Sequence, residues 1–152
     1  MVNGWHISVG IANWEWVVCE VCMSVLRVYG QSLDLDAALA ACRLKVCATQ
    51  CRGEKGVSDS DRGFSQNAIF VEFTDVGIDD FERQVENALS FLSQNQTAIA
   101  DLVGARGVEE AYLDCCIPRL DVAAQSAVFS TRLVHAAGRL NLGLCLSLYE
   151  VS

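Results

Sequence analysis

Near its C-terminus the chain alternates apolar and polar residues almost without a break over residues 140–149. Side chains of a β-strand project to opposite faces with a period of two residues, so this alternation predicts a strand with one apolar face. Five leucines share that face: Leu140, Leu142, Leu144, Leu146 and Leu148. We therefore expect this strand to form a wall of the hydrophobic core and to belong to a sheet that is apolar on one side.

The opposite face of the same strand carries small or polar side chains: Asn141, Gly143, Cys145 and Ser147. Such a face can be solvated, covered by the N-terminal segment of the chain, or used for self-association. The sequence leaves these three alternatives open.

Further strands and helices follow from the same kind of pattern. Strand-like alternation recurs over residues 25–29, 67–74 and 110–117. Apolar residues at helical spacing predict helices over 35–42, 79–103 and 130–137, the second of them interrupted near Ser93–Gln96. An apolar sheet face needs cover, and amphipathic helices supply it. The sequence therefore predicts an α+β fold, a two-layer sandwich of a mainly antiparallel β-sheet with about three helices packed on one face.

Polar residues mark where these helices begin. Asp34, Asp79 and Ser130 each precede an apolar periodic segment, where a short oxygen-bearing side chain can cap the free N–H groups of the first turn. Glu82 follows Asp79 by three residues, as in a capping box. Between the regular segments, residues 43–66 predict a long loop with room for one short strand, and residues 120–128 favour a strand.

The first 22 residues differ from the rest of the chain. They hold all three tryptophans and no Lys or Arg, and Met23 follows them directly. One hypothesis is that the natural start is Met23 and that residues 1–22 are an atypical N-terminal extension. The alternative is an extra β-hairpin, with strands over His6–Ile11 and Trp16–Cys22. In either case residues 23–152 are expected to form a single α+β domain.

The net charge of the chain argues against two classes of binding partner. The formal net charge is −8, which repels phosphate backbones and anionic lipid surfaces, so we expect neither nucleic acid nor a membrane as partner. The chain has no apolar stretch of the roughly 20 residues that a membrane helix needs. Its N-terminus has no basic start and its early apolar segment is interrupted by Glu15 and Glu20, unlike a secretory signal. We therefore expect a cytoplasmic protein.

Eight cysteines give the chain its one candidate for metal or thiol chemistry. Cys42, Cys47 and Cys51 are spaced by four and then three residues, close to the spacing of some cluster ligands but without the second close pair of a structural zinc site. Cys19 and Cys22 form a CxxC pair without a helix signal after it, unlike a redox motif. In a reducing compartment most of these side chains are expected to be small buried groups.

A glycine-containing loop supplies the candidate binding residues. Residues 43–62 hold five of the eleven basic residues of the chain, and binding side chains are often found on such loops. The candidates are Arg52, Glu54, Lys55 and Arg62. The competing interpretation is an ordinary solvated loop.

No catalytic set stands out. Of the two histidines, His135 lies between Arg132 and Arg139 at helical spacing, which is typical of a solvated basic stripe. The chain contains no GxSxG turn, Walker loop or GxGxxG segment. We therefore name no catalytic residue, expect no cofactor, and regard a non-enzymatic role as the better interpretation.

From Met23 onward the order of motifs resembles the DUF4279 domains, a small bacterial family of unknown function. The matching stretches, which span residues 23–149, are Ser24–Gly30, Leu33–Asp36, Arg52–Lys55, Phe129–Leu133 and Leu146–Tyr149. The chain departs from the family in its many cysteines and in lacking a proline before Arg52. The resemblance implies a small bacterial domain and assigns no catalytic residues. Some such proteins are similar to the immunity proteins of toxin systems.

These observations favour a protein-interaction module, immunity-like or regulatory, that uses the 43–62 loop or an exposed sheet face for a protein partner or for self-association. Two other hypotheses stay open. One is a thiol or metal-binding protein that uses Cys42, Cys47 and Cys51. The other is a small-molecule binder with a pocket between the sheet and the helices.

Overall fold

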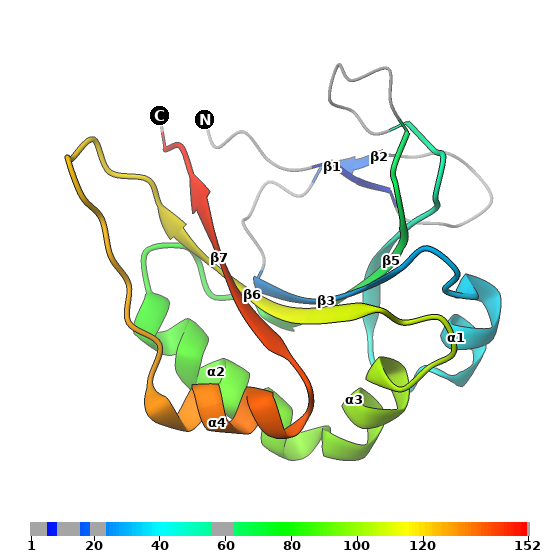
Figure 1. Ribbon diagram of the computed structural model, residues 1–152. Coiled ribbons are helices and arrows are strands. Elements are labelled where there is room, and N and C mark those ends of the chain that lie inside the picture. The colour runs from blue at the N-terminus through cyan, green and yellow to red at the C-terminus, as the bar shows by residue number, and fades with distance from the viewer. Residues whose placement is uncertain (1–5, 9–15, 19–23, 56–62, 152) are drawn as a thin grey trace.

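The computed structural model describes residues 6–8, 16–18, 24–55 and 63–151, the first two segments by their backbone alone (Figure 1). Its strands are β1 (His6–Ser8), β2 (Trp16–Val18), β3 (Ser24–Gly30), β4 (Val46–Gln50), β5 (Asn67–Thr74), β6 (Glu110–Pro118) and β7 (Gly143–Tyr149). Its helices are α1 (Leu35–Ala41), α2 (Phe81–Gln94), α3 (Gln96–Val103) and α4 (Thr131–Arg139). The predicted α+β class is confirmed.

A five-stranded sheet forms one layer, in the order β4-β5-β3-β6-β7. The pairs β4–β5, β5–β3 and β3–β6 are antiparallel, as expected. The last pair, β6–β7, is parallel, because the chain returns through α4 before it enters β7. Figure 1 shows α2, α3 and α4 together beneath the sheet, with α1 at its side.

The core lies between the sheet and these helices. Alternate residues of the central strands point into it, among them Leu26 and Val28 of β3 and Leu113 of β6, all fully buried. The helices contribute side chains at helical spacing, such as Leu92 of α2 and Leu133 of α4. One continuous cluster of 16 buried apolar residues thus fills the space between the two layers. The pocket predicted between sheet and helices would have to lie in this filled space.

Two of the three predicted helix caps are confirmed. The Asp34 carboxylate accepts a hydrogen bond from the Ala37 N–H (3.0 Å), and the Ser130 hydroxyl accepts one from the Leu133 N–H (3.2 Å). The third prediction is wrong by one residue. Asp80 rather than Asp79 caps α2, by accepting from the Arg83 N–H (3.1 Å), so Glu82 does not stand at the capping-box position.

The predicted break in the long helix is confirmed at Asn95, between α2 and α3. Its side-chain amide donates to the Phe91 carbonyl (2.9 Å), which also accepts from the Asn95 backbone N–H (3.1 Å), so Asn95 closes the last turn of α2. The described residues therefore contain four helices, against about three expected from the sequence.

The last strand is shorter than the alternation predicts. α4 extends to Arg139, and Asn141 has a positive φ of 57°, a conformation typical of the residue that follows a helix. The strand begins only at Gly143. Leu142 is buried and Leu144 packs on the core, but Leu148 is 52% exposed. The leucines therefore form a core wall only at the start of the row, which corrects the expectation of a wall along its whole length.

Two other segments also differ from expectation. Residues 120–128, favoured as a strand, form no helix or strand, and they connect β6 to α4 on the outside of the molecule. The loop predicted over 43–66 contains β4, which fits the expectation of one short strand there.

At the N-terminus, β1 and β2 pair antiparallel over three residues each. The rest of the predicted hairpin, and the proposed start at Met23, lie outside the described residues.

Within the described part of the chain, none of the helices is both long and apolar enough to cross a membrane.

Candidate functional site

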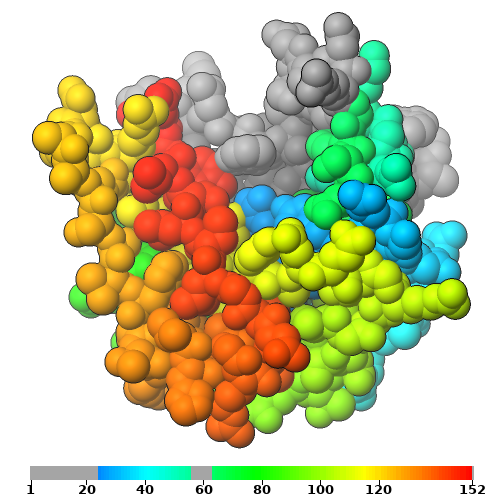
Figure 2. All heavy atoms as spheres, in the orientation of Figure 1, coloured from blue at the N-terminus to red at the C-terminus, as the bar shows by residue number. Residues whose placement is uncertain are grey.

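The free edge of β7 is the first candidate site. β7 is the last strand of the sheet order and pairs only with β6 among the described strands. Figure 2 shows its atoms, in red, open toward the viewer along the strand. The free edge of a sheet offers a row of unpaired N–H and C=O groups, which is a template for another strand. The seven residues of β7 contain no charged residue and no proline.

The other edge of the sheet is protected. β4 has five residues and its register with β5 shifts between Val46 and Ala48, so that the strand bulges. Lys45 stands directly before it, and β1 lies against it. Short length, a bulge, a lysine and a covering segment are the usual means by which proteins block edge pairing. β7 has none of the first three, so among the described strands it forms the less protected edge of the sheet.

Exposed apolar side chains gather around β7. In the described residues, every large apolar side chain that is strongly exposed lies in the last third of the chain: Leu120, Val122, Val128, Val134, Leu148 and Val151. Figure 2 shows the segments that carry them, the 119–130 connection, α4 and β7, side by side on one side of the molecule. A concentration of exposed apolar groups on one side is typical of an interaction surface.

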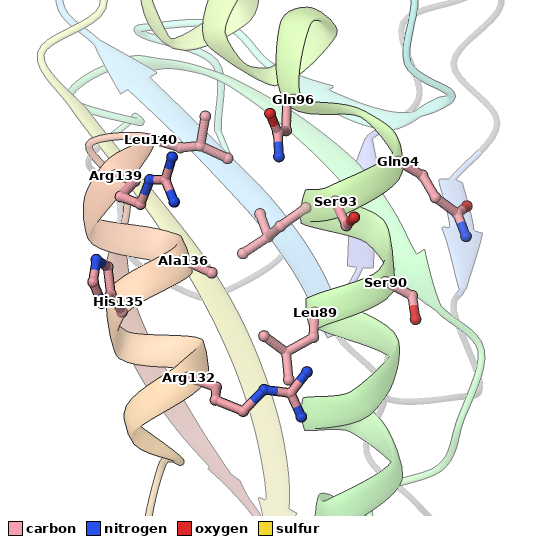
Figure 3. Close-up of a pocket in the computed structure, with 11 residues that line it drawn as sticks. Leu89, Ser90, Ser93, Gln94, Gln96, Arg132, His135, Ala136, Arg139 and Leu140 are labelled. Atoms are coloured by element: carbon pink, nitrogen blue, oxygen red, sulfur yellow. The ribbon is translucent and has the colours of Figure 1, made fainter.

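A groove between α2 and α4 is the second candidate site (Figure 3). It is an open depression of about 730 Å³, lined by α2, α4 and the start of α3. Arg132, His135 and Arg139 come from α4, and Ser90, Ser93 and Gln96 from the opposite wall. The basic stripe predicted from sequence thus lies along one rim of a groove.

A buried charge pair lies on the sheet face away from the helices. The guanidinium of Arg27 on β3 pairs with the carboxylate of Asp114 on β6, which is only 3% exposed. The Ser147 hydroxyl of β7 also donates to Asp114, at 2.7 and 2.9 Å to its two oxygens. Burial acts to lower the pKa of Arg27, but Asp114 and the Tyr29 hydroxyl outweigh it and hold this pKa above its usual value.

Aromatic rings surround this pair. Arg27 lies over the ring of Phe70, with 5.8 Å between the guanidinium carbon and the ring centroid, and Tyr29 packs edge-on against the same ring. Gly143 contacts Tyr112 so closely that a Cβ there would come within 2.8 Å of the ring. The small residues on the polar face of β7 are therefore used to seat Tyr112 and to bind Asp114.

Cys145 lies on the same face, half-buried. Burial, and after it the neighbouring Asp114 carboxylate, raise the pKa of its thiol above the usual value. Its thiolate is therefore disfavoured.

The structure does not bring the three candidate cysteine ligands together. Cys42 ends α1 and its thiol lies 3.7 Å from the Leu44 carbonyl, whereas the Cys47 thiol donates to the Phe70 carbonyl (3.3 Å). Cys51 follows β4, where burial and then Glu54 raise the pKa of its thiol. Among residues 24–55 and 63–151, no three His, Cys, Asp or Glu side chains are grouped so that they could hold a metal ion.

The candidate binding residues of the 43–62 loop lie where backbone hydrogen bonds join the two sides of that loop. Gly53 N–H donates to the Phe64 carbonyl (2.9 Å) and Phe64 N–H donates to the Glu54 carbonyl (2.9 Å), which ties the two sides of the loop together. Arg52 and Lys55 are exposed there and Glu54 is half-buried. Arg62 lies outside the described residues. The first three are thus neighbours, but they line neither the α2–α4 groove nor the β7 edge.

Cys115 provides a prediction on thiol reactivity. Its side chain is fully buried, and burial, with the nearby Asp114 charge, raises the pKa of its thiol from 9.0 to about 12. Because the thiolate is the reactive form, we expect alkylation of Cys115 at pH 8 to be on the order of 10³ slower than that of a cysteine of ordinary pKa. Iodoacetamide labelling of the native protein followed by peptide mass mapping measures this. Equal labelling rates of Cys115 in the native protein and in the urea-unfolded chain would contradict it.

The same thiol predicts a pH dependence of stability. Above pH 9.0 the unfolded chain loses this proton, while folded Cys115 keeps it up to about pH 12. The free energy of unfolding should therefore fall as pH rises through this window, and the fall should be smaller in a Cys115→Val variant. Urea unfolding at pH 8, 9 and 10 checks the direction, and a Cys115→Val variant with the same slope as the parent chain contradicts the assignment.

Sequence reasoning missed Gln84, which is fully buried in α2. Its oxygen accepts from the Ser24 hydroxyl (2.7 Å) and the Cys116 N–H (3.0 Å), and its nitrogen donates to the carbonyls of Cys116 (2.8 Å) and Gly77 (3.1 Å). In sequence it is one polar residue on an amphipathic helix, next to the apolar Val85. No signal there distinguishes it from the exposed glutamines.

Comparisons with models of protein families, with curated proteins and with solved structures gave no match for this chain. The resemblance to the DUF4279 domains therefore stays a prediction.

Proposed function

We propose that this protein is a protein-interaction module that pairs with a second copy of itself along the free edge of β7. The observation that carries the proposal is the edge itself, seven residues long and without charge, proline or register shift. Proteins that do not use an edge strand usually block it, as the β4 side of this sheet is blocked.

The sequence of β7 is symmetric about Leu146. Leu144 and Leu148 stand two residues to either side of it, and the small residues Cys145 and Ser147 stand one residue to either side. Antiparallel pairing about a two-fold axis at Leu146 would set each leucine of one copy opposite a leucine of the other. Such self-complementarity is what a two-fold interface requires, and directly opposed apolar pairs stabilise antiparallel strands.

Charge also favours a second copy at this edge. The chain carries a net charge of −8, so most pairs of its surfaces would bring like charges together. β7 itself is uncharged, and the Arg119 and Glu150 side chains beside its end already form an ion pair at 3.0 Å. Pairing along β7 therefore brings no net charge into contact. Whether the dimer serves an immunity-like or a regulatory role stays a prediction.

The test is the mass of the protein in solution. At about 50 µM we expect twice the 16.5 kDa of one chain by sedimentation equilibrium. Leu148→Lys, at a side chain that is already 52% exposed, should leave the fold intact and give a monomer, since lysine on an edge strand opposes pairing. Ala40→Lys is the control, because it adds the same charge at an exposed residue of α1, which packs on β5 in the other half of the sheet. A monomeric parent chain, or equal effects of the two substitutions, would overturn the proposal.

A further inference from the structure

The α2–α4 groove concentrates positive charge in an acidic protein. Among the residues that the structure describes, no Asp or Glu lines it, although the whole chain has 19 acidic residues against 11 Lys and Arg. Arg132, His135 and Arg139 follow one another by three and four residues on α4, so they share one face of that helix. In Figure 3 the two arginines reach toward the opposite wall, whereas the His135 ring lies at the outer rim.

These two arginines are not used elsewhere in the described structure. Arg27, Arg43 and Arg119 each form an ion pair with a carboxylate. Arg132 and Arg139 form none with residues 24–55 or 63–151, and both are exposed to the groove. A guanidinium carries five N–H donors and stays charged, so each can receive an oxyanion.

The rest of the groove adds neutral donors and an apolar floor. Ser93 and Gln96 face the arginines across the gap, and Ser90 also belongs to the α2 wall. Leu89, Leu92 and Ala136 lie between the two walls. A wholly inorganic anion would leave this floor unused, whereas an uncharged apolar molecule would leave the guanidinium groups without a partner.

We propose that the groove binds a small organic anion, a carboxylate or phosphate carried on an apolar body. The oxyanion pairs with Arg132 or Arg139 and accepts from the neutral donors opposite, and the apolar body lies on the leucine floor. The groove volume, about 730 Å³, is within the usual range of ligand sites. The seven-residue step from Arg132 to Arg139 spans about 10 Å of helix, so the site takes a molecule of several carbon atoms. This binding is independent of pairing through β7.

Four probes test the proposal by ¹H–¹⁵N NMR titration: hexanoate, hexyl phosphate, hexanol and inorganic phosphate. We expect at least one of the two hexyl anions to bind in the millimolar range or tighter, with shifts at residues of α2 and α4. Hexanol and inorganic phosphate should each bind at least about tenfold more weakly than that anion. Comparison of the two hexyl anions shows whether carboxylate or phosphate is preferred. If hexanol binds as tightly as the anions, or if neither anion binds, the proposal is wrong.

Matched charge variants locate the site. Arg132→Gln with Arg139→Gln should weaken binding of the preferred anion at least about tenfold, because both guanidinium groups are lost. Arg83→Gln with Arg106→Gln removes the same charge from two exposed arginines outside this groove and should change affinity less than about twofold. Equal weakening in both pairs would mean that only net charge matters and would overturn the proposal. Leu148→Lys should leave this affinity unchanged, which separates the groove from the β7 interface.

Discussion

Replacing Asp114 with asparagine is expected to lower the free energy of unfolding by about 3 kcal/mol, because it leaves the Arg27 charge on the sheet without its partner. Asparagine keeps the shape of the side chain, so the loss measures the charge. We expect the lower end of the range for broken buried pairs, because the Arg27 side chain is 24% exposed and can gain some hydration. Urea unfolding followed by circular dichroism measures the change.

The control for Asp114 is a charge pair of the same chemistry at the surface. Arg43 and Asp101 pair at 2.8 Å with both side chains 63% exposed, so Asp101→Asn should cost less than about 0.5 kcal/mol. Replacing both buried partners, Arg27→Met with Asp114→Leu, should recover much of the loss, since no unpaired charge then remains. Similar losses for Asp114→Asn and Asp101→Asn would show that the Arg27–Asp114 pair is not effectively buried.

Gln84→Leu should have an effect of similar size, about 3 kcal/mol of lost stability. The pairing of β3 with β6 ends at Val25 and Asp114. Two residues farther along β6, the Gln84 amide forms hydrogen bonds with both the N–H and the C=O of Cys116. Leucine has nearly the same volume but cannot form hydrogen bonds. Two buried backbone groups and the Ser24 hydroxyl would lose this partner, at about 1–3 kcal/mol for each group left unsatisfied.

Gln94→Leu on the same helix is the matched control. Gln94 is exposed at the end of α2, so this substitution should change stability by less than about 0.5 kcal/mol. Urea unfolding of both variants gives the comparison. If Gln84→Leu lowers the free energy of unfolding no more than Gln94→Leu does, the hydrogen bonds between the Gln84 amide and the backbone of Cys116 do not stabilise the fold as proposed.

The parts of the fold that sequence predicts well are those with strong local signals. The strand over 67–74 is predicted to the residue because its alternation is long and unbroken. The caps at Asp34 and Ser130 follow from side chains that bond to their own helix, three residues away. Asp79 and Asp80 stand next to each other, and composition alone does not decide which of two adjacent aspartates caps α2.

The C-terminal strand shows where local pattern fails. Alternation continues from Leu140 to Tyr149, yet the first three of these residues form the end of α4 and the turn after it. α4 returns the chain to the same end of the sheet at which β6 began, so β7 can run parallel to β6 only after that turn. The position of β7 at the edge then leaves Leu148 exposed. Whether a strand lies at the edge of the sheet depends on the order in which all the strands pair. The ten residues of the alternating segment do not contain that information.

The candidate sites depend on tertiary structure in the same way. The Arg132–Arg139 stripe is visible in the sequence, but the facing wall comes from Ser90, Ser93 and Gln96, about 40 residues earlier in the chain. Without that wall the stripe is typical of a solvated helix. Likewise the symmetry of β7 about Leu146 can be read from the sequence, but it acquires meaning only because the strand has a free edge.

The most direct test of β7 pairing is its register. In a Cys145→Ser background, Leu146→Cys places the new thiol opposite its own copy, with Cα atoms about 5 Å apart, a separation that a disulfide bridges. Leu148→Cys, in the same background, places the two new thiols four residues apart along the strands, about 14 Å. Mild oxidation should therefore link Leu146→Cys into a covalent dimer on a non-reducing gel and leave Leu148→Cys, like the Cys145→Ser parent, uncoupled. Equal coupling of the two variants, or none in Leu146→Cys, would contradict pairing through β7.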